Sequence, residues 1–185
     1  MKAHSLAVYG LAFAPGGKQL ATCSGDFEKG SSGEVKLWDA ASAKEIRTLR
    51  GFVREVWCVA FSPSGRYLAV GASRPANRKW PTVRVWEVAT GDEAANFELG
   101  PYVRCVAFSR DEKTLTAGAG DGTIGSWDVN GWKEKSSWRA GTEPLFSLVF
   151  GESTGSLIAA SKDGTATFWQ LAQPPKSVAD AKEAD

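Results

Sequence analysis

Short apolar segments recur along the chain, and each one is followed by a turn and then by a second apolar segment. The first segments of the series are residues 8–13, 56–61, 103–108 and 145–150. The intervening residues, such as Pro63-Ser64-Gly65-Arg66, are types that tolerate the backbone angles of tight turns. Apolar positions nowhere follow the spacing of an amphipathic helix. The pattern therefore predicts an all-β protein built from short antiparallel strands.

A third strand follows in every copy and ends at a tryptophan. These tryptophans are Trp38, Trp86, Trp127 and Trp169. Successive ones lie 48, 41 and 42 residues apart, close to the roughly 40 to 45 residues of one four-stranded propeller blade. A single sheet that is apolar on both faces cannot bury them by itself. The spacing therefore predicts neighbouring sheets that cover one another's faces.

Several segments carry a more specific signature, namely residues 35–39 (VKLWD), 61–65 (FSPSG) and 121–128 (DGTIGSWD). They resemble the strand endings and hairpin turn of the WD-repeat family, and the resemblance extends over about residues 4–170. It implies a β-propeller of four-stranded antiparallel blades, with four blades in this chain, which is a partial or half propeller. The expected repeats are about 4–49, 50–99, 100–139 and 140–170. A polar C-terminal tail, residues 171–185, is expected to be disordered.

Four blades are fewer than usually close a ring in this family. An open arc leaves two sheet faces exposed, which native proteins cover or pair. Three situations would account for this: two chains pair into an eight-bladed ring, the chain docks onto blades of another chain, or it derives from a longer propeller. We rank pairing or docking ahead of derivation from a longer propeller.

Members of the family commonly place a histidine before the inner strand. Its imidazole joins a hydrogen-bonded network with a turn Asp, a Ser or Thr, and the motif Trp. Only His4 stands in such a place here, whereas Phe52, Pro101 and Thr142 stand near the equivalent positions. The resemblance therefore implies a structural role for His4, and it predicts that the other three blades depend more on packing.

A large or cationic residue stands just inside each first strand. These residues are Tyr9, Trp57, Arg104 and Phe146. Tyr, Trp and Arg dominate measured binding energies at protein interfaces. In WD-repeat relatives this position, and the residue two before it, such as Tyr102, lie on the top face and commonly touch partner proteins. We therefore predict a non-catalytic scaffold or adaptor that binds other proteins or peptides there; the alternative is that these side chains only pack between blades.

Insertions of six residues separate the second strand from the third in the first two copies. The second insertion contains Arg74, Arg78, Lys79 and Trp80. An exposed indole offers apolar surface to a ligand, and arginine pairs with carboxylate or phosphate oxygens. The alternative function is therefore binding of an acidic or phosphorylated peptide, or of nucleic acid stacked on Trp80 with help from Arg84. Packing of Trp80 against its own blade is the structural explanation.

The composition argues against several other classes. Lys and Arg number 22 against 21 Asp and Glu, and the net charge of +1 gives no global reason to bind nucleic acid or an anionic membrane. No apolar run is long enough for a membrane-spanning helix. The N-terminal segment has some features of a signal peptide but fits the first repeat, so we expect a cytoplasmic protein.

Catalytic and metal chemistry find little support. The chain has one histidine, His4, and its three cysteines, Cys23, Cys58 and Cys105, form no C-x-x-C pattern. Nucleophilic triads and most metal centres need His or Cys in a definite constellation. We expect core cysteines, no catalytic residues, no metal and no cofactor. A carboxylate-only hydrolase across the axial channel is a remote alternative.

Overall fold

The computed structural model describes residues 2–26, 31–77, 79–151 and 155–170, and every regular element in these ranges is a β-strand. The first sheet contains β1 (Ala7–Phe13), β2 (Gln19–Asp26), β3 (Ser31–Asp39) and β4 (Glu45–Leu49). The second contains β5 (Val56–Phe61), β6 (Tyr67–Ala72), β7 (Val83–Glu87) and β8 (Glu93–Phe97). The third contains β9 (Val103–Phe108), β10 (Thr114–Ala119), β11 (Thr123–Asp128) and β12 (Glu134–Arg139). The fourth contains β13 (Leu145–Phe150), β14 (Ser156–Ser161) and β15 (Ala166–Gln170).

Each sheet is an antiparallel meander whose strands lie in chain order. Tight turns make this order possible; in the turn from β5 to β6, for example, Gly65 adopts a φ of 76°, which a glycine reaches without a Cβ clash. The fourth sheet has three strands within the described residues, against four in each of the others. The predicted tail, residues 171–185, lies outside the described residues.

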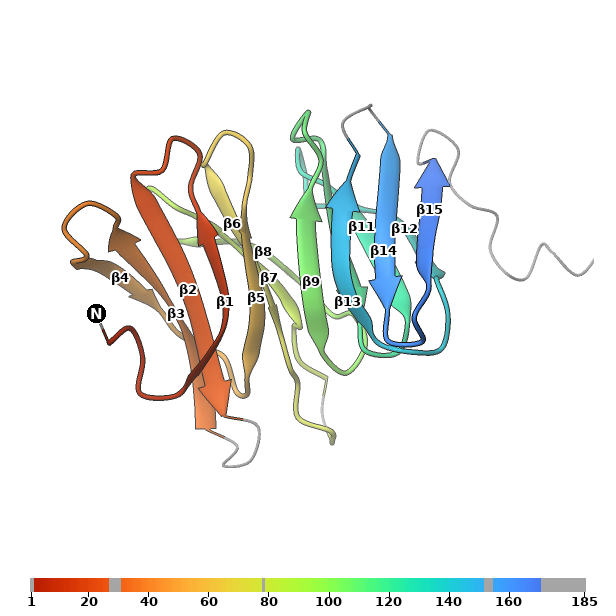
Figure 1. The fold of residues 1–185 in the computed structure, drawn as a ribbon, viewed down its shortest axis with the longest axis horizontal. Coiled ribbons are helices and arrows are strands. Elements are labelled where there is room, and N and C mark those ends of the chain that lie inside the picture. Colours follow the sequence, from red (N-terminus) through yellow and green to blue (C-terminus); the bar gives the residue numbers. More distant parts are fainter. Residues whose placement is uncertain (1, 27–30, 78, 152–154, 171–185) are drawn as a thin grey trace, which may run out of the picture.

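The four sheets stand side by side in chain order, with outer strands such as β8 and β12 behind the first strands (Figure 1). Consecutive first strands are in contact, β1 with β5, β5 with β9, and β9 with β13. The first strands therefore form the inner wall of an arc. This arrangement confirms the all-β class and the partial propeller of about four blades.

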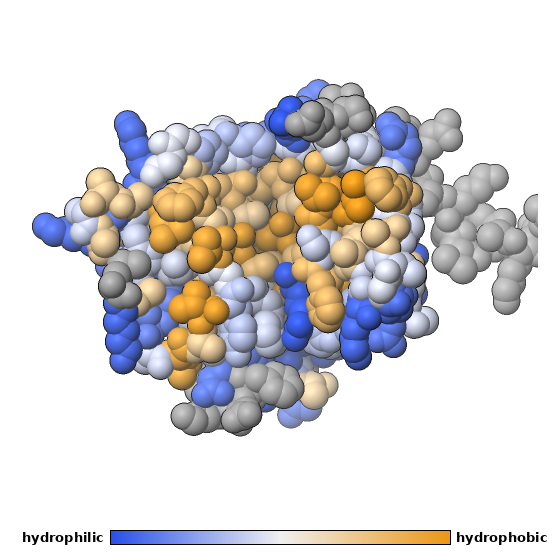
Figure 2. Space-filling view, in the orientation of Figure 1, coloured by the Kyte–Doolittle hydropathy of each residue, from blue (hydrophilic) through white to orange (hydrophobic). Residues whose placement is uncertain are grey.

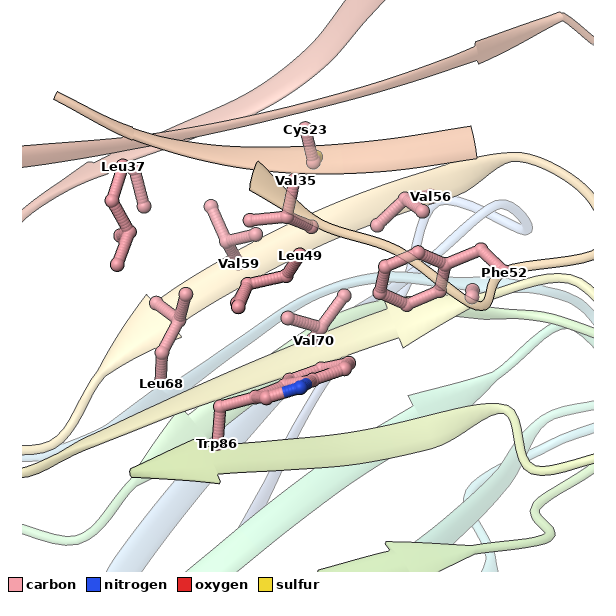
Figure 3. Close-up of a cluster of buried hydrophobic side chains, with 12 residues drawn as sticks. Cys23, Val35, Leu37, Leu49, Phe52, Val56, Val59, Leu68, Val70 and Trp86 are labelled. Carbon is pink, nitrogen blue, oxygen red and sulfur yellow. The ribbon is translucent and has the colours of Figure 1, made fainter. Parts of the chain in front are cut away.

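The core lies between the sheets rather than inside any one of them. Across the first interface, one sheet contributes Ala21, Cys23, Val35 and Leu37, and the next contributes Val56, Val59, Leu68, Val70 and Trp86. Figure 3 shows these two sets facing each other. Similar clusters fill the next two interfaces. Each inner sheet is thus covered on both faces, as the apolar pattern of its strands predicts.

The two end faces lack such a cover within the described residues. On the first sheet, Leu11 is 65% and Phe13 is 60% exposed, whereas Val59, at the place of Leu11 in the second sheet, is 9% exposed. On the fourth sheet, Val149 is 52% and Phe168 is 71% exposed. The arc therefore ends on both sides in apolar side chains of the kind that it buries internally.

Candidate partner-binding site

A β-bulge interrupts the same place in every first strand. In β1, for example, Val8 pairs with Ser24 and Gly10 pairs with Cys23, which leaves Tyr9 as the extra residue. The extra residues of the four strands are Tyr9, Trp57, Arg104 and Phe146. A bulge re-aims the side chain of its extra residue. The four residues predicted from the sequence to contact a partner are therefore the four that leave the regular pleat.

These four side chains form a continuous row along the inner wall. The rings of Tyr9 and Trp57 have centroids 4.5 Å apart. The guanidinium carbon of Arg104 lies 4.4 Å from the Trp57 ring centroid and 5.2 Å from that of Phe146. Together they line an open depression of about 410 Å³. We call these four residues the aromatic–arginine row.

Arg104 is the only charged residue of the row, and its guanidinium is held by aromatic rings rather than by acidic groups. Its Nε is buried and has no hydrogen-bond partner. Among the described residues, its side chain forms no hydrogen bond or ion pair, and its contacts are with the rings of Trp57, Phe146 and Tyr102. Guanidinium groups normally donate several hydrogen bonds. The row therefore contains unused donor capacity.

Tyr102 lies beside the row. Its ring covers Gly120, where an added Cβ would lie 2.0 Å from the ring, so a side chain at that position would displace it. The same ring lies 5.6 Å from the Arg104 guanidinium carbon. Tyr102 also lines a second depression, of about 290 Å³, with Arg54, Ser73 and Arg74. It therefore connects the row to the inserted loop of the second sheet.

The face that carries β1, β5, β9 and β13 is crossed by a broad hydrophobic band (Figure 2). Exposed apolar residues of these strands include Leu11, Phe13 and Val149. Contiguous apolar surface of this kind on a folded protein marks a contact surface more often than isolated apolar residues do. These three residues belong to the two end faces of the arc, so the exposed apolar surface extends from the first strands onto the faces that no sheet covers.

Two arginines of the predicted basic cluster, Arg74 and Arg84, are engaged by the fold. Arg74 donates from Nε to the Gly100 carbonyl oxygen, 3.1 Å away. Arg84 pairs with Glu93 and donates to the Gly51 carbonyl oxygen. Lys79 is exposed and Trp80 is half-buried, and Arg78 lies outside the described residues. Two of the arginines therefore already hold parts of the fold.

His4 takes the structural role that its position implies. Its Nε2 lies 2.7 Å from Thr22 Oγ1, which also accepts a hydrogen bond from Trp38 Nε1 at 2.8 Å. Its Nδ1 lies 3.0 Å from both Ser24 Oγ and Glu34 Oε1. The acidic partner is thus Glu34 on β3 rather than a turn aspartate. Nothing in the inserted residues before β3 predicts that Glu34 replaces the turn aspartate as the acidic partner of His4.

Glu55 stands two residues before Trp57, a position at which the family resemblance implies contact with partner proteins. It immediately precedes β5 and is fully buried, and both of its carboxylate oxygens lack a hydrogen-bond partner. A buried carboxylate without partners lowers the stability of a fold. Glu55 is thus close to the row along the chain.

The cysteines are core residues, as predicted. All three are free thiols, and burial raises the pKa of Cys23 and of Cys105 to about 12. Burial also raises the pKa of Cys58, and the nearby thiols of Cys105 and Cys23 raise it further. Among the described residues, no group of three or more His, Cys, Asp or Glu side chains is placed to hold a metal ion. In the same residues, no helix has the length and apolar character to cross a membrane.

Comparison with known proteins supports the repeat pattern. The family model for "WD domain, G-beta repeat" matches residues 1–39, 43–87 and 96–128, which together are more than half of the chain. Each match covers the first three strands of one of the first three sheets, the second match also includes β4, and β12 lies beyond the matched residues. The strands of the fourth sheet lie beyond the matched residues.

Curated proteins with related sequences are much longer than this chain. Telomerase protein component 1 of Rattus norvegicus is 28% identical over 172 residues, which are 91% of this chain and 6% of that protein. Nuclear distribution protein PAC1 of Arthroderma otae is 34% identical over 70% of this chain and 28% of its own length. The serine-threonine kinase receptor-associated protein of Homo sapiens is 24% identical over 83% of this chain and 42% of its own length. The chain therefore spans less than half the length of each of these relatives.

Solved structures show the same fold. The structure of U3-55K superposes with a TM-score of 0.79 at 19% identity, over 92% of this chain and 51% of that chain. The computationally designed Ika4 protein superposes with a TM-score of 0.74 at 23% identity, over 92% of this chain and 95% of its own. At these identities the likeness concerns the fold alone. The arc of four sheets thus matches about half of one solved chain and nearly all of another.

Proposed function

The chain belongs to the WD40 repeat family, and on that basis we propose that it is a non-catalytic scaffold that binds other proteins through its aromatic–arginine row. Proteins of this family are typically interaction scaffolds and are generally non-catalytic. Because a fold does not by itself define a function, the proposal rests on the site.

The observation that carries the proposal is the repeated bulge. Four strands each direct their one extra residue into the same depression, and three of these residues, Tyr9, Trp57 and Arg104, are of types that dominate interface energies. Side chains that only packed between sheets would be covered by the sheets. Trp57 and Arg104 of the two inner sheets are instead only half-buried, and Tyr9 and Phe146 of the two end sheets are 39% and 46% exposed. A partner that covered the row would bury this aromatic surface.

Replacing Trp57, Tyr102 and Arg104 together by alanine tests the proposal. We expect the triple variant to lose most of the proteins that affinity capture recovers with the unchanged chain. The matched control replaces Ile46 and Arg139, which are exposed on the outer strands β4 and β12. Circular dichroism checks that both variants keep the fold. Equal recovery by a folded triple variant would contradict the proposal.

The rival function is nucleic-acid or phosphopeptide binding through the Trp80 loop. Arg74 and Arg84 are engaged with backbone carbonyls and, for Arg84, with Glu93, so fewer cations face a ligand there than the sequence suggested. Electrostatic binding of nucleic acid weakens steeply between about 50 and 200 mM salt. Salt-sensitive binding of single-stranded RNA that depends on Lys79 and Trp80 would favour this rival.

A second proposal concerns assembly, and the exposed end faces favour it. At each of the three internal interfaces, two different sheet faces meet. One is the face that carries Val8, Leu11 and Phe13 in the first sheet, and the other is the face that carries Val149 and Phe168 in the fourth sheet. Two copies arranged head to tail would bring these two kinds of face together twice and give a ring of eight sheets. We therefore propose that the 185-residue chain pairs with a second copy.

Light scattering coupled to size-exclusion chromatography tests the pairing. We expect the mass of a dimer at micromolar concentration, and a shift toward monomer when Leu11 and Phe168 are both replaced by glutamate. A well-behaved monomer of the unchanged chain would contradict the pairing. It would leave the proposed scaffold function intact.

A further inference from the structure

The aromatic–arginine row contains a cation that the fold does not neutralise. The Arg104 Nε is buried without a hydrogen-bond partner, and no described carboxylate pairs with this guanidinium. Other cations of the fold do have acidic partners, such as Arg84 with Glu93 and Arg66 with Glu87. Burying Nε without an acceptor costs free energy, while Arg104 as a whole is half-buried and lines the open depression. A ligand that supplies the anion would recover that cost.

The sign of the charge decides which ligand fits. Aromatic surroundings by themselves also suit ammonium and guanidinium ligands, because ring faces attract cations. In this row, however, the rings of Trp57 and Phe146 already hold the Arg104 guanidinium. A second cation would meet like charge at the centre of the depression. An anionic ligand is therefore favoured over a cationic one.

The number of charged groups in the depression distinguishes between a carboxylate and a phosphoryl group as its ligand. The side chains that line the depression are Tyr9, Trp57, Arg104 and Phe146, of which one is charged. A carboxylate carries a single negative charge and matches the two-donor edge of a guanidinium. A phosphoryl group carries close to two negative charges, so one of them would have no counter-charge in this lining. The depression is thus better suited to a carboxylate.

We infer that the row binds an acidic peptide, in which the carboxylate of one Asp or Glu pairs with Arg104 and apolar neighbours cover the flanking rings. Trp57 and Phe146 lie on the two flanks of the guanidinium, and Tyr9 extends the row past Trp57. The preferred sequence is therefore an acidic residue between apolar or aromatic residues. This inference rests on the proposed function, because it names the chemistry of the partner at the same site.

The test uses a displayed library of random dodecapeptides, selected on the immobilised 185-residue chain. We expect the selected peptides to share one Asp or Glu flanked by apolar residues. The strongest binder is then synthesised in three forms: unchanged, with the acidic residue replaced by its amide, and with phosphoserine in its place. Fluorescence polarisation should show that the amide form binds at least about tenfold more weakly, as expected for loss of a charged hydrogen-bonded pair. The phosphoserine form should bind no more tightly than the unchanged peptide.

Protein variants complete the design. Arg104→Gln should weaken the unchanged peptide about as much as the amide replacement does, and it should make the two peptide forms equal in affinity. Arg110→Gln is the matched control. It removes a guanidinium group from a residue that lies two positions after the C-terminal end of β9, and it should leave binding unchanged. Arg104→Glu should redirect the library selection from acidic to basic peptides. The comparison of peptide forms on the unchanged protein needs no variant, so it remains decisive if Arg104 variants fail to fold.

The outcomes distinguish failure of the acidic-peptide inference from failure of the proposed scaffold function. Peptides that need Trp57 and Phe146 but bind equally well in acid and amide forms would overturn the acidic inference and leave the scaffold function standing. Tighter binding of the phosphoserine form would overturn it in favour of a phosphorylated partner. Failure to select any peptide that depends on the row would overturn both the inference and the proposed function.

Discussion

The first and third sheets share one strand pattern, but they secure the motif tryptophan by different means. In the first sheet, Trp38 donates a hydrogen bond to Thr22, and His4 completes the network. In the third sheet, Ala117 stands at the place of Thr22, and Trp127 stacks on Phe97 with ring centroids 4.4 Å apart and an interplanar angle of 17°. The blade therefore requires a filled space beside its tryptophan, and either a polar network or an aromatic stack can fill it.

The two sheets also differ in how completely their buried polar groups are satisfied. The buried side chains of His4, Thr22 and Ser24 in the first sheet all have partners. In the third sheet, Thr116 Oγ1 and Trp138 Nε1 are buried without a partner. Since an unsatisfied buried polar group costs stability, the same substitution should have opposite effects in the two sheets.

The largest expected effect is the removal of the aromatic stack in the third sheet. Trp127→Ala should lower the free energy of unfolding by about 3–5 kcal/mol, because it leaves a cavity beside Phe97 in the core between the second and third sheets. Urea unfolding followed by circular dichroism measures the change. A loss below about 1 kcal/mol would show that the stack is not what holds this sheet.

A smaller loss is expected from the polar network of the first sheet. Thr22→Val puts there the residue that the second sheet has at the equivalent place, Val70. Trp38 Nε1 and His4 Nε2 would lose their shared partner, so we expect a destabilisation of about 1–3 kcal/mol by urea unfolding. No change would mean that packing alone secures Trp38, as it does Trp127.

The matched substitution in the third sheet should act in the opposite direction. Thr116→Val removes a buried hydroxyl that has no partner and keeps nearly the same shape. We expect an increase in the free energy of unfolding of up to about 1 kcal/mol, measured in the same urea series. Destabilisation as large as that of Thr22→Val would refute the contrast between the two sheets.

The smallest difference is expected between the thiols of the two sheets. Burial raises the pKa of Cys23 in the first sheet and of Cys105 in the third to about 12. Both thiols should stay unreactive toward a disulfide reagent at about pH 8 in the folded protein and react on unfolding, since the thiolate is the reactive form. The ordinary pKa of a cysteine thiol is near 9.0. Keeping these two thiols protonated in the core therefore leaves the free energy of unfolding unchanged below that pH, and the free energy of unfolding falls as the pH rises from there toward 12. Rapid reaction of either thiol in the folded state would contradict its burial.

The repeat and its strands could be predicted from the sequence because strand periodicity and turn residues are local signals. Tyr9, Trp57, Arg104 and Phe146 could be singled out by type and position, although the bulges that redirect them could not, because a bulge depends on the register with the neighbouring strand. Whether they bind a partner stays a prediction.

The repeating β unit and the tryptophan that ends each third strand follow from spacing along the chain, and the structural place of His4 follows from the resemblance to the WD-repeat family. The sequence gives no sign that Arg104 lies among aromatic rings without an acidic partner, whereas Arg84 pairs with Glu93. The Arg84 pair joins residues nine apart on the adjacent strands β7 and β8 of one sheet, so it is a local contact. The rings of Trp57 and Phe146 reach Arg104 from the two neighbouring sheets, so its surroundings are settled by packing between sheets rather than by order along the chain.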